Sequence, residues 1–352
     1  MRTNDRFEWV VRGLVVVFAV AMLVVGALFY GLIRDLTAGW TGTGLNPFRP
    51  AARASEVAGS GPVQPTPTIF LPEVTPIPWD GSTRVTILLL GLDYRDWVAG
   101  LGAPRSDSMI LLSVDPLTKQ VSMLSIPRDL WVEIPGFTHN RINTAYASGE
   151  GNRLPGGGPA LAMRAVEALV GVPIQYYAVI DFSTFERMID EIGGIDVLVM
   201  ERIKIAPIGR LSLWLDPKAY HLDGAQALAY ARVRKATGGD FGRAERQQQV
   251  AMAILDRVTG FDMIPTLVAK APTLFQELST GVRTNMTLNE MIALAWMARD
   301  ISSESIHRGA IAPPGMVGFY TRPDGAQVLR AVPDQIRQLR DQLFVDTSAI
   351  AP

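Results

Sequence analysis

The chain of 352 residues contains no cysteine and only three histidines, His139, His221 and His307. The absence of cysteine excludes disulfide bonds, thiolate metal ligands and a cysteine nucleophile. The histidines show no H-E-x-x-H or comparable ligand spacing, which argues against a zinc hydrolase. Neither G-x-S-x-G nor G-x-x-x-x-G-K-[ST] occurs, so the sequence also argues against a serine hydrolase elbow and a P-loop.

A large excess of charge of one sign is also missing. The 33 lysines and arginines against 34 aspartates and glutamates give a net charge of -1 at pH 7. The overall balance therefore offers no electrostatic reason to expect nucleic acid as a partner. Any anion-binding site must be a local cluster of basic residues.

One long hydrophobic run is present near the N-terminus. Residues 13–33 read GLVVVFAVAMLVVGALFYGLI, an uncharged stretch long enough to cross a bilayer. Three arginines precede it and one closely follows it, a bias that places the N-terminus in the cytoplasm. A cleaved signal peptide is the alternative, but its apolar region would be shorter, about 7 to 15 residues. The sequence predicts a cytoplasmic tail at 1–12, a transmembrane helix at 13–33 and a single-pass protein of the cell membrane.

The rest of the chain divides into a linker and one large domain. Residues 34–82 are rich in Gly, Pro and Thr without sustained periodicity, which is typical of a linker. Across 83–345, short apolar runs alternate with helical patterns, so an extracytoplasmic α/β domain is expected. The expected strands are at 84–93, 106–115, 121–130 and 177–181, and the expected helices at 158–170, 184–192, 224–231, 243–258 and 288–297.

Charged residues stand at the ends of three expected strands. The first strand runs into Asp93, the second begins beside Asp107, and the third ends at Arg128. Because open α/β folds build their sites at the rim of the sheet, Asp93 and Asp107 are candidate ligands for a hard divalent cation. The alternative is that both aspartates are ordinary turn and capping residues.

Two arginines follow the expected helix at 224–231. Arg232 and Arg234 are two residues apart, so they would point in opposite directions on a helix but to the same side of an extended segment. If the helix ends near residue 231, the two guanidinium groups form a pair.

A further basic segment, GDFGRAERQQ, opens the expected helix at 243–258. Asp240 can cap this helix, whose first turns would present Arg243, Arg246 and Gln247 on one face. Such a helix start suits a pyrophosphate, because guanidinium groups bind phosphate oxygens bidentately. A solvated helix start, with Glu245 and Asp240 neutralising the arginines, is equally compatible with the pattern.

Taken in order, several segments resemble the LytR-CpsA-Psr family: GLDYR, RSDSMILLSVD, SIPRDLWVEIPG, RINTAYASG, LDGAQALAYARVRK and GDFGRAERQQQV. The resemblance covers about residues 84–260, weakens through 340 and includes the N-terminal anchor typical of the family. It implies an αβα sandwich with a central mixed sheet. It also implies a phosphotransferase that moves a glycopolymer, such as a teichoic acid, from a polyprenyl-pyrophosphate carrier to peptidoglycan and releases polyprenyl phosphate.

The resemblance also implies roles for individual residues. Asp93 and Asp107 match the aspartates that bind Mg²⁺, and Asp107 and Arg128 are the residues expected in catalysis. Arg141 departs from the family pattern, which more often has lysine, so charge is kept but hydrogen-bonding geometry is not. The residues expected to bind the pyrophosphate are Arg95, Arg105, Arg128, Arg141, Arg232, Arg234, Asp240, Arg243, Arg246 and Gln247.

Two other functions are compatible with the same sequence. The first is a pyrophosphatase that hydrolyses the lipid carrier with water as acceptor. The second is a non-enzymatic, membrane-bound regulator of envelope synthesis, although only about a dozen residues precede the expected membrane helix, too few for a DNA-binding domain. Residues 261–352 carry no evident chemistry and are expected to complete the fold.

Overall fold

The computed structural model describes residues 83–92, 103–260, 263–278 and 281–344. The expected tail, transmembrane helix and linker at 1–82 lie outside the described residues, as do Asp93 and Arg95. Among the helices that are described, none combines the length and apolar character needed to span a bilayer.

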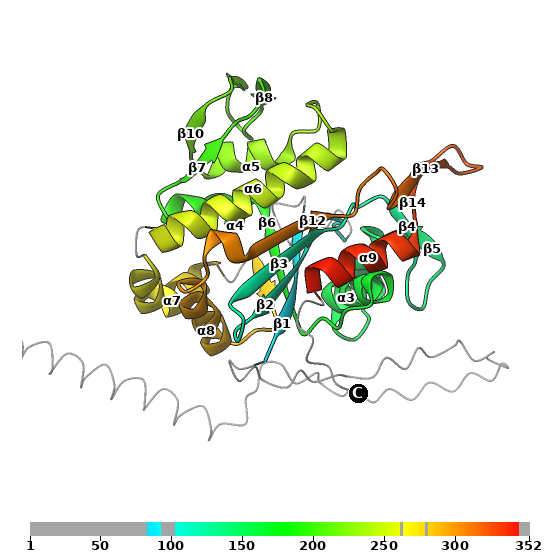
Figure 1. Ribbon diagram of the computed structural model, residues 1–352, viewed down its shortest axis with the longest axis horizontal. Helices are drawn as coiled ribbons and strands as arrows, with labels where there is room; N and C mark the ends of the chain where they lie inside the picture. Colours follow the sequence, from blue (N-terminus) through cyan, green and yellow to red (C-terminus); the bar gives the residue numbers. More distant parts are fainter. Residues whose placement is uncertain (1–82, 93–102, 261–262, 279–280, 345–352) are drawn as a thin grey trace, which may run out of the picture. The chain divides into compact units, whose positions relative to one another are not determined.

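A six-stranded mixed sheet forms the centre of the described domain (Figure 1). β1 pairs with β2 in antiparallel and with β6 in parallel orientation, so both orientations occur on one strand. The expected α/β fold with a central mixed sheet is therefore confirmed. The strands are, in spatial order, β11 (Val282–Thr284), β6 (Tyr176–Asp181), β1 (Val85–Leu92), β2 (Ser106–Asp115), β3 (Gln120–Ser125) and β12 (Ile306–Ala310).

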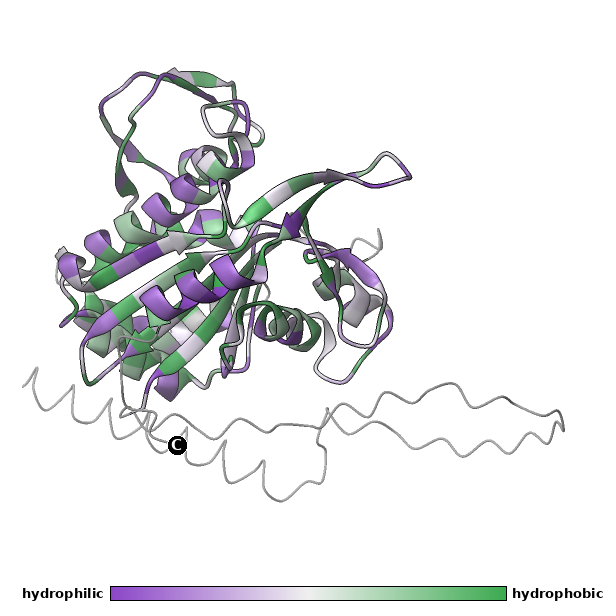
Figure 2. Cartoon of the chain, turned by 45° about the vertical axis from the view of Figure 1, so that its right-hand side comes forward, coloured by the Kyte–Doolittle hydropathy of each residue, from purple (hydrophilic) through white to green (hydrophobic). Residues whose placement is uncertain are grey.

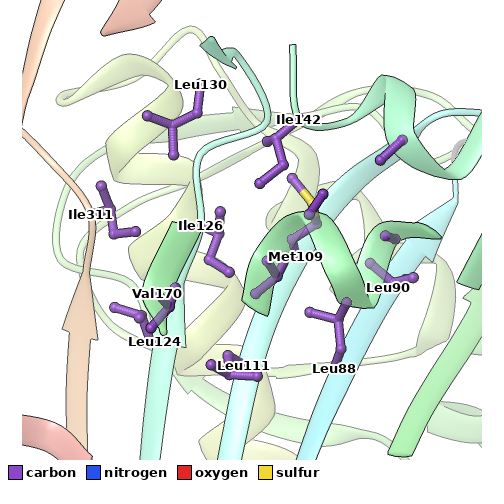
Figure 3. Close-up of a cluster of buried hydrophobic side chains, with 14 of the residues drawn as sticks. Leu88, Leu90, Met109, Leu111, Leu124, Ile126, Leu130, Ile142, Val170 and Ile311 are labelled. Atoms are coloured by element: carbon purple, nitrogen blue, oxygen red, sulfur yellow. The ribbon is translucent and has the colours of Figure 1, made fainter. Parts of the chain in front are cut away.

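Both faces of this sheet are buried under helices. Alternate side chains of β1 point to opposite faces, so Leu88 and Leu90 join one apolar cluster (Figure 3) while Val85 and Ile87 join another. Burial on both faces explains why the strands read as nearly continuous apolar runs. The first cluster includes α2 (Thr144–Gly151), α3 (Gly157–Val170) and α9 (Pro333–Phe344), and the second includes α6 (Gly239–Gly260) and α8 (Leu288–Ala298).

Smaller sheets flank the end of the central sheet at which β1 finishes and β2 begins. A four-stranded sheet has the order β13 (Val317–Thr321), β14 (Gln327–Ala331), β4 (Leu130–Glu133) and β5 (His139–Arg141). The pairs β7 (Ile195–Leu198) with β10 (Ala219–Leu222) and β8 (Ile203–Ile205) with β9 (Leu213–Leu215) form a separate lobe. A third apolar cluster joins this lobe to α4 (Phe182–Glu191), α5 (Gly224–Arg232) and α6. The remaining helix of the described residues, α7 (Ile264–Leu278), packs against α8.

The expected strands and helices are present, with two main differences. The strand expected at 121–130 is divided, because β3 ends at Ser125 and β4 of another sheet begins at Leu130. The other difference is at the start of α6. This helix begins at Gly239, earlier than the position 243 expected from the apolar pattern. Gly238 and Gly239 have φ angles of +81° and +56°, a conformation that side-chain-bearing residues rarely adopt. The two glycines turn the chain directly into the helix and so bring its first turn to the edge of the site.

Candidate functional site

Asp107 lies at the centre of a cluster of charged side chains. Its position near the start of β2 puts it at the rim of the central sheet. Arg128 Nη1 donates to one carboxylate oxygen at 2.9 Å, and Arg234 Nη2 donates to the other at 3.3 Å. Residues from three distant stretches of the chain therefore meet as the sequence predicted.

The loop that carries Arg128 is held by backbone hydrogen bonds on both sides. Ile126 N donates to Met109 O at 3.0 Å, and Asn143 N donates to Arg128 O at 3.2 Å. Pro127, which has no N–H to offer a neighbouring strand, stands where β3 has ended. These contacts fix the backbone beneath the Arg128 guanidinium group.

The charge of Arg128 is stabilised despite its partial burial. Burial opposes the charged form, but the carboxylates of Asp107, Asp129 and Asp240 outweigh this effect and raise the pKa of Arg128. Its guanidinium group therefore remains a permanent cation at the site.

Asp240 supplies a second carboxylate to the cluster. Its Oδ1 lies 3.3 Å from Arg243 Nη1 and 3.6 Å from Arg234 Nε. The sequence suggested that Asp240 could cap the helix, but it lies inside the first turn of α6 and its side chain faces these arginines instead. Asp240 is thus part of the charged cluster.

Arg243 shows that the cluster carries excess positive charge. Its side chain is only 8% exposed. Burial is the main cause that lowers the pKa of Arg243; Asp240 opposes this shift, whereas repulsion from Arg234 and Arg128 adds to it. Four guanidinium groups, those of Arg128, Arg141, Arg234 and Arg243, therefore share the three carboxylates of Asp107, Asp129 and Asp240. A bound anion would relieve the repulsion among the arginines.

Gln247 and Arg232 complete the wall beside the cluster. Gln247 Nε2 donates to Ser108 Oγ at 2.7 Å, which ties α6 to β2. Arg232 is the last residue of α5, and its Cζ lies 4.4 Å from the centroid of the Phe182 ring. Arg232 and Arg234 both face the same cavity, as expected if the helix ended near residue 231.

Two adjoining cavities open at this cluster. The first has a volume of about 620 Å³, and Asp107, Arg128 and Arg243 form its charged side. The second, of about 470 Å³, shares Asp107 and Arg243, and its lining also includes four further basic residues, Lys204, Arg232, Arg234 and Lys235. The other side of the first cavity is apolar and consists of Met109, Ile126, Phe241, Ile311, Phe319, Val328 and Leu329.

The apolar side of the first cavity modifies one expectation from the sequence. Ile311, Phe319 and Leu329 belong to the segment 261–352, for which the sequence indicated no chemistry. This segment completes the fold, and it also supplies half of a wall that an apolar ligand could contact. A cationic rim beside an apolar wall suits an amphiphile with an anionic head group.

Other predicted residues lie at the edge of the site or away from it. Arg105 and Arg141 line a small pocket next to Asp107, and Arg141 Nε is 3.1 Å from Asp129 Oδ1. Arg246 is buried and faces away from these cavities: its Nη2 donates to Val233 O at 2.8 Å. Arg246 therefore supports the turn that carries Arg234, and its predicted contact with a pyrophosphate is not supported by its position.

Oxygen atoms near Asp107 fit a hard divalent cation. Asn143 is 3% exposed, and its Oδ1 has no hydrogen-bond partner among the described residues. It lines the same small pocket as Asp107. Mg²⁺ often binds only one or two carboxylates and takes its other oxygens from phosphate and water. No cluster of three His, Asp or Glu ligands occurs in the described part of the chain, so a cation here would depend on substrate phosphates and on residues such as Asp93.

Gly242 allows the first turn of α6 to approach the segment that follows Arg234. A Cβ atom at this position would clash with the backbone oxygen of Thr237.

Gly242→Ala is therefore expected to lower the free energy of unfolding by about 1–3 kcal/mol. It should also weaken binding of inorganic pyrophosphate by displacing Arg243. Denaturant unfolding and calorimetric titration measure the two effects. Gly260→Ala, at the open end of the same helix, is the matched control and should change neither; undiminished pyrophosphate binding by Gly242→Ala would argue against this packing.

Comparisons with known proteins agree with this fold. The model of the LytR_cpsA_psr family matches residues 65–344. The polyisoprenyl-teichoic acid–peptidoglycan teichoic acid transferase TagV of Bacillus subtilis (strain 168) is 35% identical over 256 residues, which cover 69% of this chain and 61% of TagV. The regulatory protein MsrR of Staphylococcus aureus (strain COL) is 34% identical over 213 residues, which cover 60% of this chain and 58% of MsrR. This chain thus spans about three fifths of the length of these curated relatives.

This chain covers a larger share of the solved structures that it matches than of the curated relatives. A crystal structure of B. subtilis TagV has a TM-score of 0.61 and 30% identity, covering 75% of this chain and 98% of that one. A structure of TagT bound to LI-WTA has a TM-score of 0.57 and 26% identity, covering 76% and 91%.

Proposed function

The chain belongs to the LytR_cpsA_psr family, and on that basis we propose that it transfers a glycopolymer from a polyprenyl-pyrophosphate carrier to peptidoglycan. The name of TagV as a teichoic acid transferase and the TagT structure with LI-WTA bound support this proposal. The observation that carries it is structural. Four arginines, Arg128, Arg141, Arg234 and Arg243, share the three carboxylates of Asp107, Asp129 and Asp240 beside apolar side chains, an arrangement complementary to a lipid diphosphate.

In the proposed reaction the guanidinium groups bind the diphosphate and hold it in place. A hydroxyl group of peptidoglycan attacks the phosphorus linked to the sugar, so a new P–O bond forms to the wall while the P–O bond to polyprenyl phosphate breaks. Negative charge grows on the leaving phosphate, and Arg128, Arg234 and Arg243 are placed to stabilise it. Asp107, whose carboxylate accepts hydrogen bonds from Arg128 and Arg234, is the candidate to receive the hydroxyl proton.

Mg²⁺ is part of the proposal. Asp107, together with Asp93, would hold it, and the ion would supply further neutralisation of the phosphate oxygens. The support is that Asp107, Asp129 and Asn143, whose Oδ1 has no hydrogen-bond partner among the described residues, line one small pocket together with Arg105, Arg128 and Arg141.

We also propose how the chain is arranged at the membrane. The tail at 1–12 lies in the cytoplasm, the helix at 13–33 crosses the cell membrane, and a linker at 34–82 leads to an extracytoplasmic αβα domain at 83–345. The uncharged run and the arginines before it support this topology. A carrier that stays in the bilayer also requires a catalytic domain close to the membrane.

Product analysis distinguishes transfer from hydrolysis. The full-length protein in vesicles is given a lipid-linked glycan radiolabelled in the sugar, with and without peptidoglycan. We expect the label to become covalently attached to peptidoglycan when it is present. Release of soluble glycan phosphate at the same rate in both reactions would instead identify a pyrophosphatase.

The name of the relative MsrR favours a regulatory role as the second candidate function. A regulator would act without turnover of the lipid-linked glycan. The test is a cell whose only copy of the protein carries Arg128→Ala. If the protein is a transferase, the cell wall should lose its attached glycopolymer. If the protein is purely a regulator, the cell wall should keep it.

A further inference from the structure

Large apolar side chains are exposed on the lobe formed by β7, β10, β8 and β9. Leu211 is 92% exposed, Met200 76%, Trp214 54% and Leu198 53%. We call these four residues the exposed tip. Figure 2 shows the lobe at the top of the view, with some segments of its ribbon coloured as hydrophobic. A group of exposed apolar residues of this size usually marks a surface that binds something.

Basic side chains surround the exposed tip. Arg202 Cζ lies 4.9 Å from the centroid of the Trp214 ring, and Lys204 Nζ lies 6.0 Å from it. Lys218 Nζ lies 4.9 Å from the centroid of the Tyr220 ring. Protruding leucine and methionine beside aromatic rings and long basic side chains match the polarity gradient of a bilayer surface, where rings and cations occupy the head-group region.

Two lysines of the lobe favour an anionic surface. Residues 195–222, from β7 to β10, contain four basic and three acidic residues. Glu201 and Asp216 lie next to arginines, and Arg210 is paired with Asp223. Lys204 and Lys218 have no carboxylate partner among the described residues, so their charge is available to lipid phosphates. Attraction to anionic lipids adds to burial of the apolar tip.

The same lobe forms part of the proposed active site. Lys204 of β8 and Ala206 line the second cavity together with Arg232 and Arg234. A bilayer in contact with the exposed tip would therefore lie next to the opening through which a lipid-linked diphosphate has to enter.

We propose that the exposed tip docks into the head-group region of a bilayer that contains anionic lipid and so holds the second cavity at the membrane surface. This inference rests on the proposed function, in which the carrier lipid remains in the bilayer.

The expected linker is long enough to allow this orientation of the domain. β1 enters the domain at the end of the sheet away from the site, because Val85 pairs with Val114; residues 34–82 could span up to ~150 Å at ~3.1 Å per residue, enough to return to the membrane.

The absence of native cysteine permits a direct test with single-cysteine variants of the full-length protein. Leu211→Cys carries an environment-sensitive fluorophore at the tip. Leu117→Cys is the matched control, because Leu117 is 81% exposed in the turn between β2 and β3, at the other end of the sheet. Both proteins are reconstituted in vesicles that contain phosphatidylglycerol, without substrate.

The proposal predicts a blue-shifted emission at position 211 that is quenched by doxyl-labelled lipids, and a water-like, unquenched emission at position 117. Equal, water-like emission at both positions would overturn it. A blue shift at 211 that depends on protein concentration and resists the lipid quencher would also overturn it, because the tip would then be covered by a second copy of the chain.

A second measurement separates this inference from the proposed function. Leu211→Ser combined with Met200→Ser should raise the apparent KM for a lipid-linked glycan in vesicles severalfold and leave kcat unchanged, whereas Leu117→Ser should change neither. Tip immersion in a wild-type protein that performs no transfer would uphold docking and reject the proposed function. Transfer by a wild-type protein whose tip remains in water would uphold the proposed function and reject docking.

Discussion

Arg128→Ala is expected to reduce the rate of glycopolymer transfer by about 10³-fold, the effect typical of losing an arginine that stabilises charge on a transferred phosphoryl group. Arg128 is held at the rim of the cavity by Asp107 at 2.9 Å and by the backbone of its loop. Initial rates with labelled lipid-linked glycan measure the loss. Arg128→Lys should restore only part of the rate, because lysine keeps the charge but not the planar pair of donors.

The control for this variant lies at the other end of the sheet. Lys119 Nζ is 3.2 Å from Asp300 Oδ2 in an exposed pair. Lys119→Ala removes one cation from the surface and should leave the transfer rate unchanged, since exposed ion pairs contribute little. Turnover by Arg128→Ala near that of the Lys119→Ala protein would contradict the assignment of the site.

Asp107→Asn is expected to separate binding from catalysis. The substitution keeps the shape of the side chain and removes a negative charge that now partly neutralises Arg128 and Arg234. Inorganic pyrophosphate should therefore bind at least as tightly as to the wild-type protein. The transfer rate should fall by about 10²–10⁴-fold if Asp107 accepts the hydroxyl proton, and the dependence of the residual rate on Mg²⁺ should weaken.

Calorimetric titration with pyrophosphate and a Mg²⁺ series of initial rates measure these effects. Asp300→Asn, the other half of the exposed Lys119 pair, is the matched carboxylate control and should leave binding and rate unchanged. An Asp107→Asn protein with the kcat of the wild type would show that this carboxylate takes no part in the reaction.

Much of the charged site could be predicted because its residues stand at the ends of strongly patterned elements. The apolar runs of β1, β2 and β3 fix the sheet, and Asp107 and Arg128 stand next to two of those runs. Because α5 ends at Arg232, the next residues are extended, and Arg234 can contact Asp107. Local pattern and spacing predicted where these residues stand, and the resemblance to the family distinguished them from ordinary turn and capping residues.

Helical spacing was not sufficient for Arg246. At 3.6 residues per turn, Arg246 and Gln247 are turned about 60° and about 40° to opposite sides of Arg243. Both neighbours lie within one helix face, so spacing alone does not decide which of them lines the cavity with Arg243. The structure places Gln247 there. Arg246 instead faces the backbone oxygen of Val233, a long-range contact that sequence spacing does not reveal.

The apolar wall could not be predicted because an apolar residue in a cavity wall has the same sequence pattern as one in a core. Ile311 and Leu329 belong to the buried cluster beneath the sheet and also line the first cavity. Their position depends on β12 pairing with β3 and on β14 pairing with β4, contacts between segments far apart in the chain. Neither pairing has a local signal.

The most direct test of the central claim is a crystal structure of the protein with Mg²⁺ and a short-chain polyprenyl pyrophosphate. The claim predicts diphosphate oxygens within hydrogen-bonding distance of Arg128, Arg234 and Arg243, with the metal on Asp107 and the isoprenoid against the apolar wall of the first cavity. A diphosphate bound elsewhere, with these arginines still paired to Asp107 and Asp240, would contradict it.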